Sequence, residues 1–199
     1  VAEREHMGGI CLNWGCIPTK ALLKNAELYH TLAHRADEFG LSVKGLSYDW
    51  EKVISRSRGV ADQLAGGIEF LFKKNKVDYI RGTGCLSASG KLDVIDAEAK
   101  NDGDKVIGSK DALTRKTQPK SIVIIGAGAI WIEFAYFYNA YGTEVTVVEM
   151  MDTVLPVEDN EVSKTLEKSL TKDGSKLMTS TKTSSAEVTK DGVKLTVEP

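Results

Sequence analysis

The sequence has few cysteines, no marked excess of charge of either sign and no long apolar run. Three cysteines in 199 residues are too few for the disulfide framework of a small secreted protein, so a disulfide here would be catalytic rather than structural. With a net charge of −2 and interspersed acids and bases, nothing suggests a nucleic-acid or membrane partner. The longest apolar run, residues 122–132, is too short to span a bilayer. The composition, 42% hydrophobic and 27% charged, is instead typical of a globular protein.

Two long helices are predicted in the first half of the chain. Pro18 suits the first turn of a helix, because it lacks only an N–H that has no helical partner there. Apolar residues then recur at helical intervals for about five turns: Leu22, Ala26, Tyr29 and Ala33. Asp49 is a good N-cap for the second helix, whose expected apolar face is Val53, Val60, Leu64, Ile68 and Leu71. The alternating segments 77–86 and 91–96 are predicted to pair as strands.

The second half has the pattern of a nucleotide-binding unit. Residues 100–120 are polar and aperiodic and are interpreted as a linker. Residues 121–149 then give a strand, a glycine-rich turn, a helix and a strand, which is one βαβ unit. A further helix is expected over 161–172, with Gly174 as its C-cap, and a hairpin with an Asp-Gly turn over 186–197. The predicted fold class is therefore α/β, with a Rossmann-like βαβ domain beside a domain that contains long helices.

Cys11 and Cys16 are separated by four intervening residues in the segment GGICLNWGCIPTKALL. A zinc site would need a second ligand pair, and neither the third cysteine nor the scattered histidines form one, so no metal site is predicted. From the spacing alone, two buried cysteines are as plausible as a redox pair. The context favours the redox pair, because Cys16 would lie at a helix N-terminus that lowers the pKa of a thiol. Gly8 and Gly9 would also let the backbone approach a flat ligand.

The segment Leu-Asn-Trp-Gly-Cys-Ile-Pro-Thr-Lys resembles the active site of the pyridine nucleotide–disulfide oxidoreductases, above all the branch that oxidises dihydrolipoamide. The resemblance extends over nearly the whole chain. It implies that Cys11 exchanges with the substrate dithiol and that Cys16 lies next to a flavin. It also implies that Lys20 lies near the flavin N5, that Glu133 pairs with this lysine, and that Glu3 binds the adenosine ribose of FAD. Without the resemblance, Glu3 would be interpreted as a surface charge, whereas the apolar neighbours of Glu133 favour a partly buried, paired role for that residue.

The segment IIGAGAIWIEF carries a second glycine motif. Gly126 would form the tight turn, and Gly128 would let a pyrophosphate approach the helix N-terminus. The acid expected about 20 residues later is Glu149, which would bind a ribose 2′-OH and repel a 2′-phosphate, so NAD is favoured over NADP. A βαβ unit that binds nothing is the alternative. Trp131 takes the place of the third glycine, so we expect a displaced helix or an indole in the cofactor groove, with weaker NAD binding or a local shift.

The resemblance implies a flavin-dependent oxidoreductase that uses FAD and NAD and acts on lipoyl groups of 2-oxo-acid dehydrogenase complexes. It further implies a homodimer in the bacterial cytoplasm or the mitochondrial matrix. The implied organisation is a partial FAD-binding domain with the redox disulfide (1–99), the linker (100–120) and a partial NAD-binding domain (121–199). The family's first glycine motif and its C-terminal domain have no counterpart here, so we expect an incomplete chain or a reduced homologue. A glutathione or mercuric reductase, which Glu149 disfavours, and an inactive module that binds a nucleotide or a protein stay open.

Overall fold

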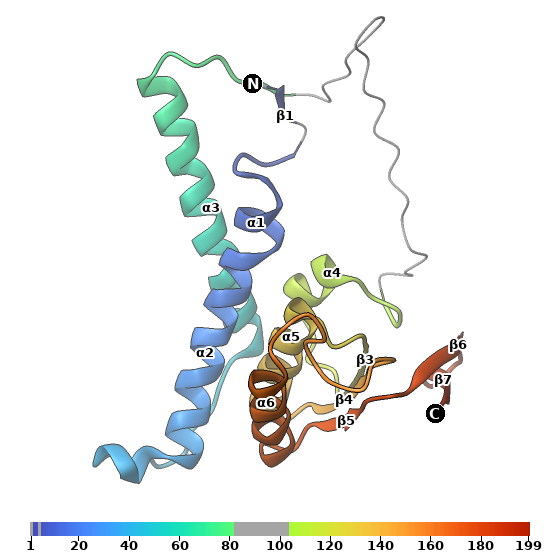
Figure 1. The fold of residues 1–199 in the computed structure, drawn as a ribbon. Coiled ribbons are helices and arrows are strands. Elements are labelled where there is room, and N and C mark those ends of the chain that lie inside the picture. Colours follow the sequence, from blue (N-terminus) through green and yellow to red (C-terminus); the bar gives the residue numbers. More distant parts are fainter. Residues whose placement is uncertain (1, 4, 82–103) are drawn as a thin grey trace, which may run out of the picture.

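The computed structural model describes residues 2–3, 5–81 and 104–199. The first half consists of β1 (Ala2–Glu3), α1 (Gly9–Trp14), α2 (Cys16–His34), the 3-10 helix η1 (Ala36–Phe39), α3 (Trp50–Lys74) and β2 (Ile80–Arg81). The second half consists of α4 (Ser109–Thr114), β3 (Ser121–Ile125), α5 (Ala129–Ala140), β4 (Glu144–Val148), α6 (Asn160–Lys172), β5 (Lys176–Met178), β6 (Lys182–Val188) and β7 (Val193–Glu198). The long helices α2 and α3 pack on each other, and α2 also packs on α5 (Figure 1).

The predicted start of α3 is confirmed, and the predicted apolar face is confirmed in part, since Val53, Val60 and Ile68 are half-buried. Asp49 caps the helix, its carboxylate accepting a hydrogen bond of 3.1 Å from the N–H of Lys52. The buried residues are Trp50, Ile54, Ser57 and Ala61, all in the N-terminal half. Leu64 and Leu71, which were expected to be buried, are about half exposed. The reason is that the N-terminal half enters the core, while the C-terminal half extends away from it (Figure 1) and keeps a contact of Ile68 near Gly8.

The stretch interpreted as a linker contains the short helix α4. Its residues Ala112 and Leu113 are buried, and the hydroxyl of Tyr138 donates a hydrogen bond of 2.9 Å to the carbonyl of Ala112. Burial raises the pKa of Tyr138 to about 12. Residues 109–114 are therefore part of the core, and the division of the chain into domains stays a prediction.

The two strand segments predicted over 77–86 and 91–96 fall mostly outside the described residues. Ile80 and Arg81 form the two-residue strand β2, which pairs in parallel with β1 near the N-terminus. The polypeptide therefore brings Glu3 beside Arg81 in register. Cys85 also lies outside the described residues.

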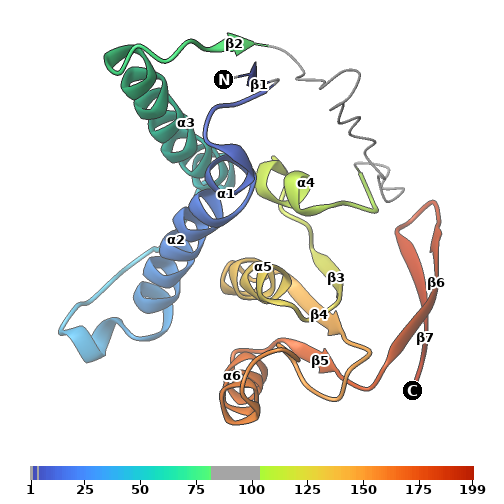
Figure 2. The same ribbon diagram turned by 45° about the horizontal axis from the view of Figure 1, so that its top comes forward.

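The βαβ unit is confirmed. Strands β3, β4 and β5 form a parallel sheet in that order, and α5 and α6 lie on the same side of it, opposite the hairpin (Figure 2). The predicted helix over 161–172 corresponds to α6, and Gly174 follows it with a φ of 102°, the left-handed conformation that ends many helices. The antiparallel hairpin of β6 and β7 is also present.

Among the described residues, a cluster of buried apolar side chains joins the two halves. It contains residues of α2, α3 and α4 together with residues of β3, α5, β4 and α6. Helix α5 lies at its centre, with Phe134, Phe137 and Tyr138 at most 2% exposed. The active-site segment and the nucleotide-binding unit are therefore held by one core.

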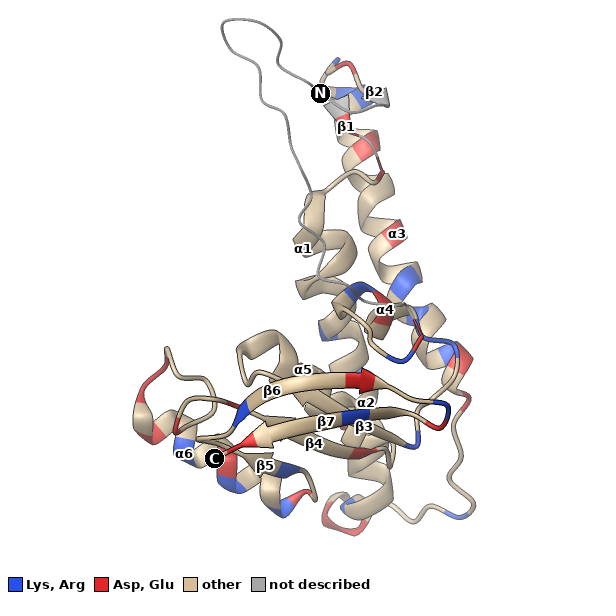
Figure 3. Ribbon diagram, turned by 90° about the vertical axis from the view of Figure 1, so that its right-hand side faces the viewer, with Lys and Arg blue, Asp and Glu red and all other residues tan. Residues whose placement is uncertain are grey.

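Charged residues of both signs are distributed over the surface elements (Figure 3). Among the described residues, no helix has the length and apolar character needed to cross a membrane.

Candidate active site

Cys11 and Cys16 form a disulfide across a bend between two helices. Cys11 lies within α1, Cys16 is the first residue of α2, and their Cα atoms are 4.9 Å apart. Both residues are exposed. Gly15 forms the bend, and a Cβ atom at this position would lie only 3.3 Å from the Cα of Cys11 and from the carbonyl oxygen of Ile10. The glycine is thus needed for the close approach of the two cysteines, a role that the sequence analysis did not assign.

Cys16 lies where a helix favours negative charge. The backbone N–H groups of the first turn point toward the end of α2 that carries the disulfide. Gly15, the residue before the helix, has no side chain that could cap them. An anion is stabilised at this end of a helix by the orphan N–H groups and the helix dipole. A thiolate released at Cys16 on reduction would receive this stabilisation.

Lys20, one turn after Cys16, forms an ion pair and hydrogen bond with Glu133 of α5. The two residues are 113 positions apart in the sequence, and the resemblance alone predicted their pairing. Their side chains are 61% and 27% exposed, so the pair adds little to stability. Its effect is positional, because it places one charge of each sign next to the disulfide-bearing turn of α2.

The short helix α1 is fixed by polar contacts that the sequence analysis missed. The buried amide of Asn13 donates hydrogen bonds of 2.9 and 3.0 Å to the carbonyls of Met7 and Gly9. From α3, the guanidinium of Arg58 donates a 2.7 Å hydrogen bond to the carbonyl of Asn13 and lies 4.4 Å from the ring centroid of Trp14. Burial lowers the pKa of Arg58. These contacts hold Cys11 in place.

The two glycines before α1 differ in their surroundings. Gly8 has a φ of 100°, in the left-handed region that favours glycine, and a Cβ there would lie 2.5 Å from Leu12 Cδ1 and 2.9 Å from Ile68 Cδ1, two side-chain ends that would have to move. Gly9 has no atom within 4 Å of a corresponding Cβ, and its backbone is open to a ligand. Glu3, at the end of β1, accepts a 2.9 Å hydrogen bond from the N–H of Glu5.

The second glycine motif forms the turn between β3 and α5, and Glu149 lies against it. One carboxylate oxygen of Glu149 accepts a 2.6 Å hydrogen bond from the N–H of Ala127, and the other accepts a 2.8 Å bond from the N–H of Met151. Gly126, with a φ of 96°, turns the chain at the carboxyl end of β3. A Cβ on Gly128 would meet nothing within 4 Å. This arrangement fits the ribose and pyrophosphate of a dinucleotide.

Trp131 is the exception in this motif. Its Cδ1 atom lies 3.7 Å from the position of a Cβ on Gly126, and its ring centroid is 6.2 Å from that of Phe134. The half-buried indole therefore lies beside the glycine turn and also packs against the core cluster, and its effect on the cofactor groove stays a prediction.

Comparison with known proteins agrees with this geometry. Residues 121–198 match the family model described as pyridine nucleotide-disulphide oxidoreductase. The chain is 39% identical to a dihydrolipoyl dehydrogenase of Corynebacterium glutamicum over 89% of the chain and 43% of that protein. It is 37% identical to one from Acholeplasma laidlawii over 90% of the chain and 60% of that protein. It is 35% identical to a mitochondrial one from Pisum sativum, over the whole chain and 44% of that protein.

The fold also has a solved counterpart. The crystal structure of LpdA from Mycobacterium tuberculosis superposes with a TM-score of 0.85 at 23% identity, covering 99% of this chain and 48% of that one. The chain thus spans about half the length of the relatives it matches. Together with the parallel sheet and the cysteine pair at the start of α2, the match over residues 121–198 identifies this part of the chain as a domain of the pyridine nucleotide–disulphide oxidoreductase family.

Proposed function

We propose that this chain carries the redox disulfide and part of the NAD site of a dihydrolipoyl dehydrogenase. The reaction is dihydrolipoyl dithiol plus NAD⁺ to lipoyl disulfide plus NADH and a proton. The observation that carries the proposal is the exposed Cys11–Cys16 disulfide at the N-terminus of α2, one turn from the Lys20–Glu133 pair. The substrates would be lipoyl groups of 2-oxo-acid dehydrogenase complexes, and the working form a homodimer.

The two cysteines divide the chemistry between them. A substrate thiolate attacks the Sγ atom of Cys11, the Cys11–Cys16 bond breaks, and Cys16 leaves as a thiolate stabilised by the helix N-terminus. The second substrate sulfur, after losing its proton to a base, attacks the first one; the bond between the first sulfur and Cys11 breaks, Cys11 takes up the proton, and the substrate leaves as a disulfide. Two electrons then reside on the cysteine pair, with one proton on Cys11.

Several residues fit the two cofactors of this reaction. Lys20, Glu133 and the open backbone at Gly9 would hold the flavin, and Glu3 its adenosine ribose. Gly126, Gly128 and Glu149 would hold NAD. When bound, the flavin would transfer the two electrons from the thiols to the nicotinamide. The protein would place the charges of Lys20 and Glu133 beside the flavin, and it holds Cys16 in a fixed position at the start of α2.

Dihydrolipoamide should reduce the Cys11–Cys16 disulfide. The experiment is anaerobic incubation of the oxidised protein with dihydrolipoamide, alkylation of free thiols and peptide mass spectrometry. We expect labelling of Cys11 and Cys16 after treatment, and of Cys85 both before and after it. Reduced glutathione at the same thiol concentration is the control and should act more slowly, because a dithiol closes its own disulfide in the second step. A disulfide that contains Cys85 in the untreated protein would contradict the assignment.

NAD should bind more tightly than NADP. The 2′-phosphate of NADP would lie beside the Glu149 carboxylate. Two like charges about 4 Å apart repel each other by roughly 1 kcal/mol in bulk water and about 4 kcal/mol near a protein surface. Calorimetric titration with each dinucleotide measures the difference, and Glu149→Gln should reduce it. Equal affinities in the parent protein would mean that Glu149 does not contact the ribose.

The position of Trp131 supports a second candidate function, an inactive module that binds a nucleotide or a partner protein. An indole beside Gly126 would narrow the groove in which a pyrophosphate would lie and so weaken the NAD binding that the oxidoreductase needs. Flavin absorbance in the purified protein distinguishes the two functions, since only the oxidoreductase requires FAD.

Replacing Trp131 with glycine should strengthen NAD binding. The change removes the indole from the glycine turn, although a glycine inside a helix costs about 1 kcal/mol of stability relative to alanine. NAD titrations of the variant and the parent give the result, and a thermal melt checks the fold. Equal affinities would show that the indole leaves the groove open, and loss of binding would show that it forms part of the site.

A further inference from the structure

Two of the three histidines of the chain lie on adjacent turns at the C-terminal end of α2. His30 and His34 are four residues apart, so their side chains share one face of the helix. Their ring centroids are 4.8 Å apart, with the planes inclined by 50°. Histidines at this spacing can bind one metal ion together, as in the zinc helices of metalloproteases.

The nitrogens of both rings are available. Within the described chain, the contact of His30 and His34 with each other is the single interaction of either imidazole. His30 is half-buried against the helix surface, while His34 is exposed. Partial burial restricts the side chain of His30, and exposure lets an ion reach the pair from solvent.

The local electrostatics also favour a cation. The last carbonyl groups of a helix and its dipole attract positive charge. The neighbouring cation, Arg35, is engaged elsewhere, since its guanidinium donates hydrogen bonds of 2.6 to 3.1 Å to the carboxylate of Glu38. Earlier in α2, the charge of Lys24 is neutralised by Glu27, with 2.8 Å between the lysine Nζ and the glutamate Oε2.

We propose that His30 and His34 form a binding site for a divalent transition-metal ion of the Zn²⁺, Ni²⁺ and Cu²⁺ class, which imidazole suits. The described residues place no third histidine, cysteine, aspartate or glutamate with them, so water completes the coordination and the ion exchanges with solvent. The site lies at the opposite end of α2 from Cys16, roughly 27 Å along the helix axis at 1.5 Å per residue. Metal therefore binds there without contacting the disulfide, and it links the last two turns of α2.

The test is calorimetric titration of the oxidised protein with Zn²⁺ and with Ni²⁺, after removal of any affinity tag. The Cys11–Cys16 disulfide must stay intact, because free thiolates bind zinc themselves. We expect one ion per chain. His30→Ala and His34→Ala should each weaken metal binding by roughly tenfold or more. Removal of a residue that merely hydrogen-bonds to a metal ligand already costs about that much affinity, and removal of the ligand itself should cost at least as much. His6→Ala, which removes the remaining histidine, is the matched control and should bind as the parent does.

A thermal melt provides the second measurement. Excess Ni²⁺ should raise the melting temperature of the parent and of His6→Ala, but not that of His34→Ala. Because the side chain of His34 is exposed, its removal should leave the protein folded, so a missing shift would not result from unfolding. Unchanged affinity in His34→Ala would overturn the proposal, as would weakened binding in His6→Ala. One ion per two chains would also overturn it, because the ion would then join two copies rather than two turns of one helix.

Discussion

Replacing Cys16 with serine is expected to abolish the oxidation of dihydrolipoamide. A serine hydroxyl cannot form a disulfide with Cys11, so the substrate thiolate has no sulfur–sulfur bond to break and no leaving group at the N-terminus of α2. The loss should be roughly a thousandfold or more, the scale seen when one member of a catalytic unit is removed. The measurement is the rate of NADH formation by the flavin-loaded protein in the presence of dihydrolipoamide and NAD⁺.

Cys85→Ser is the matched control, because it is the same substitution at the remaining cysteine. It should leave the rate unchanged. If Cys85→Ser were as damaging as Cys16→Ser, the pairing of Cys11 with Cys16 would not be the functional one. A Cys16→Ser variant that kept full activity would contradict the proposed function itself.

Replacing Phe137 with alanine should cost about 3–5 kcal/mol of the free energy of unfolding. Phe137 is fully buried in α5, and its ring centroid lies 5.3 Å from that of Trp50, 5.1 Å from Tyr138 and 5.5 Å from Tyr141. The substitution leaves a cavity at the point where α3 meets α5, and aromatic contacts are lost in addition to buried area. Urea denaturation followed by tryptophan fluorescence measures the change.

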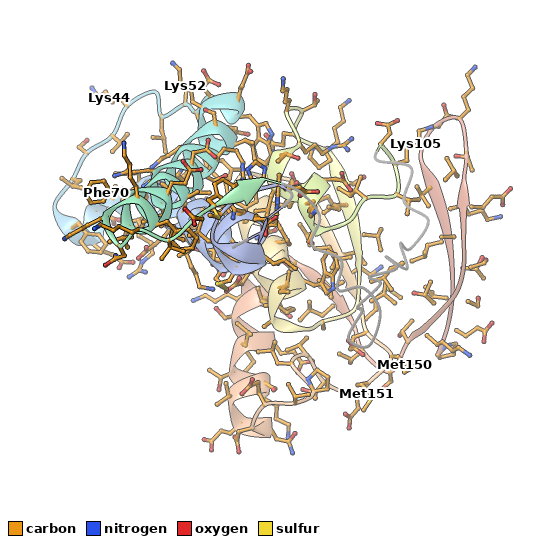
Figure 4. All side chains as sticks on the ribbon, turned by 90° about the horizontal axis from the view of Figure 1, so that it is seen from above. Lys44, Lys52, Phe70, Lys105, Met150 and Met151 are labelled. Atoms are coloured by element: carbon orange, nitrogen blue, oxygen red, sulfur yellow. A yellow bond between two sulfur atoms is a disulfide. The ribbon has the colours of Figure 1, made fainter. Side chains whose placement is uncertain are left out.

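Phe70→Ala provides the control for this prediction. Phe70 lies on the C-terminal half of α3 and is 64% exposed (Figure 4), so the same substitution there should change stability by about 0.5 kcal/mol or less. Equal losses at the two positions would mean that α3 and α5 do not share a core in solution.

Much of the fold was predictable because its signals are local. Pro18 and Asp49 mark the starts of α2 and α3, and the glycine turn after an apolar strand marks the βαβ unit. The Asp-Gly turn likewise identifies the terminal hairpin. Each of these features depends on residues that are close in sequence, so one segment at a time suffices to recognise them.

The rest depends on contacts between distant segments. Helices α1 and α4 have six residues each, too few for an apolar period to emerge. The buried face of α3 is set by which half of the helix meets α1 and α2, and it includes Ser57, which hydropathy would place outside. The roles of Gly15 and Arg58 arise only when the cysteines and Trp14 are brought together. The pairing of Lys20 with Glu133 was accessible through family resemblance alone.

The packing of α2 on α5 has a consequence for the order of assembly. The Lys20–Glu133 pair and the stacked rings of Tyr29 and Tyr141, 5.0 Å apart, join segments more than a hundred residues apart in the chain. Closing a loop of that length has a length-dependent entropic cost of about 4 kcal/mol, whereas α2 can meet α3, and β3 can meet β4, over much shorter loops. We therefore expect each half to gain its own helices and strands first, and the α2–α5 contact to form last. All the contacts across that junction share one closure cost, so they should form and break together as one cooperative unit.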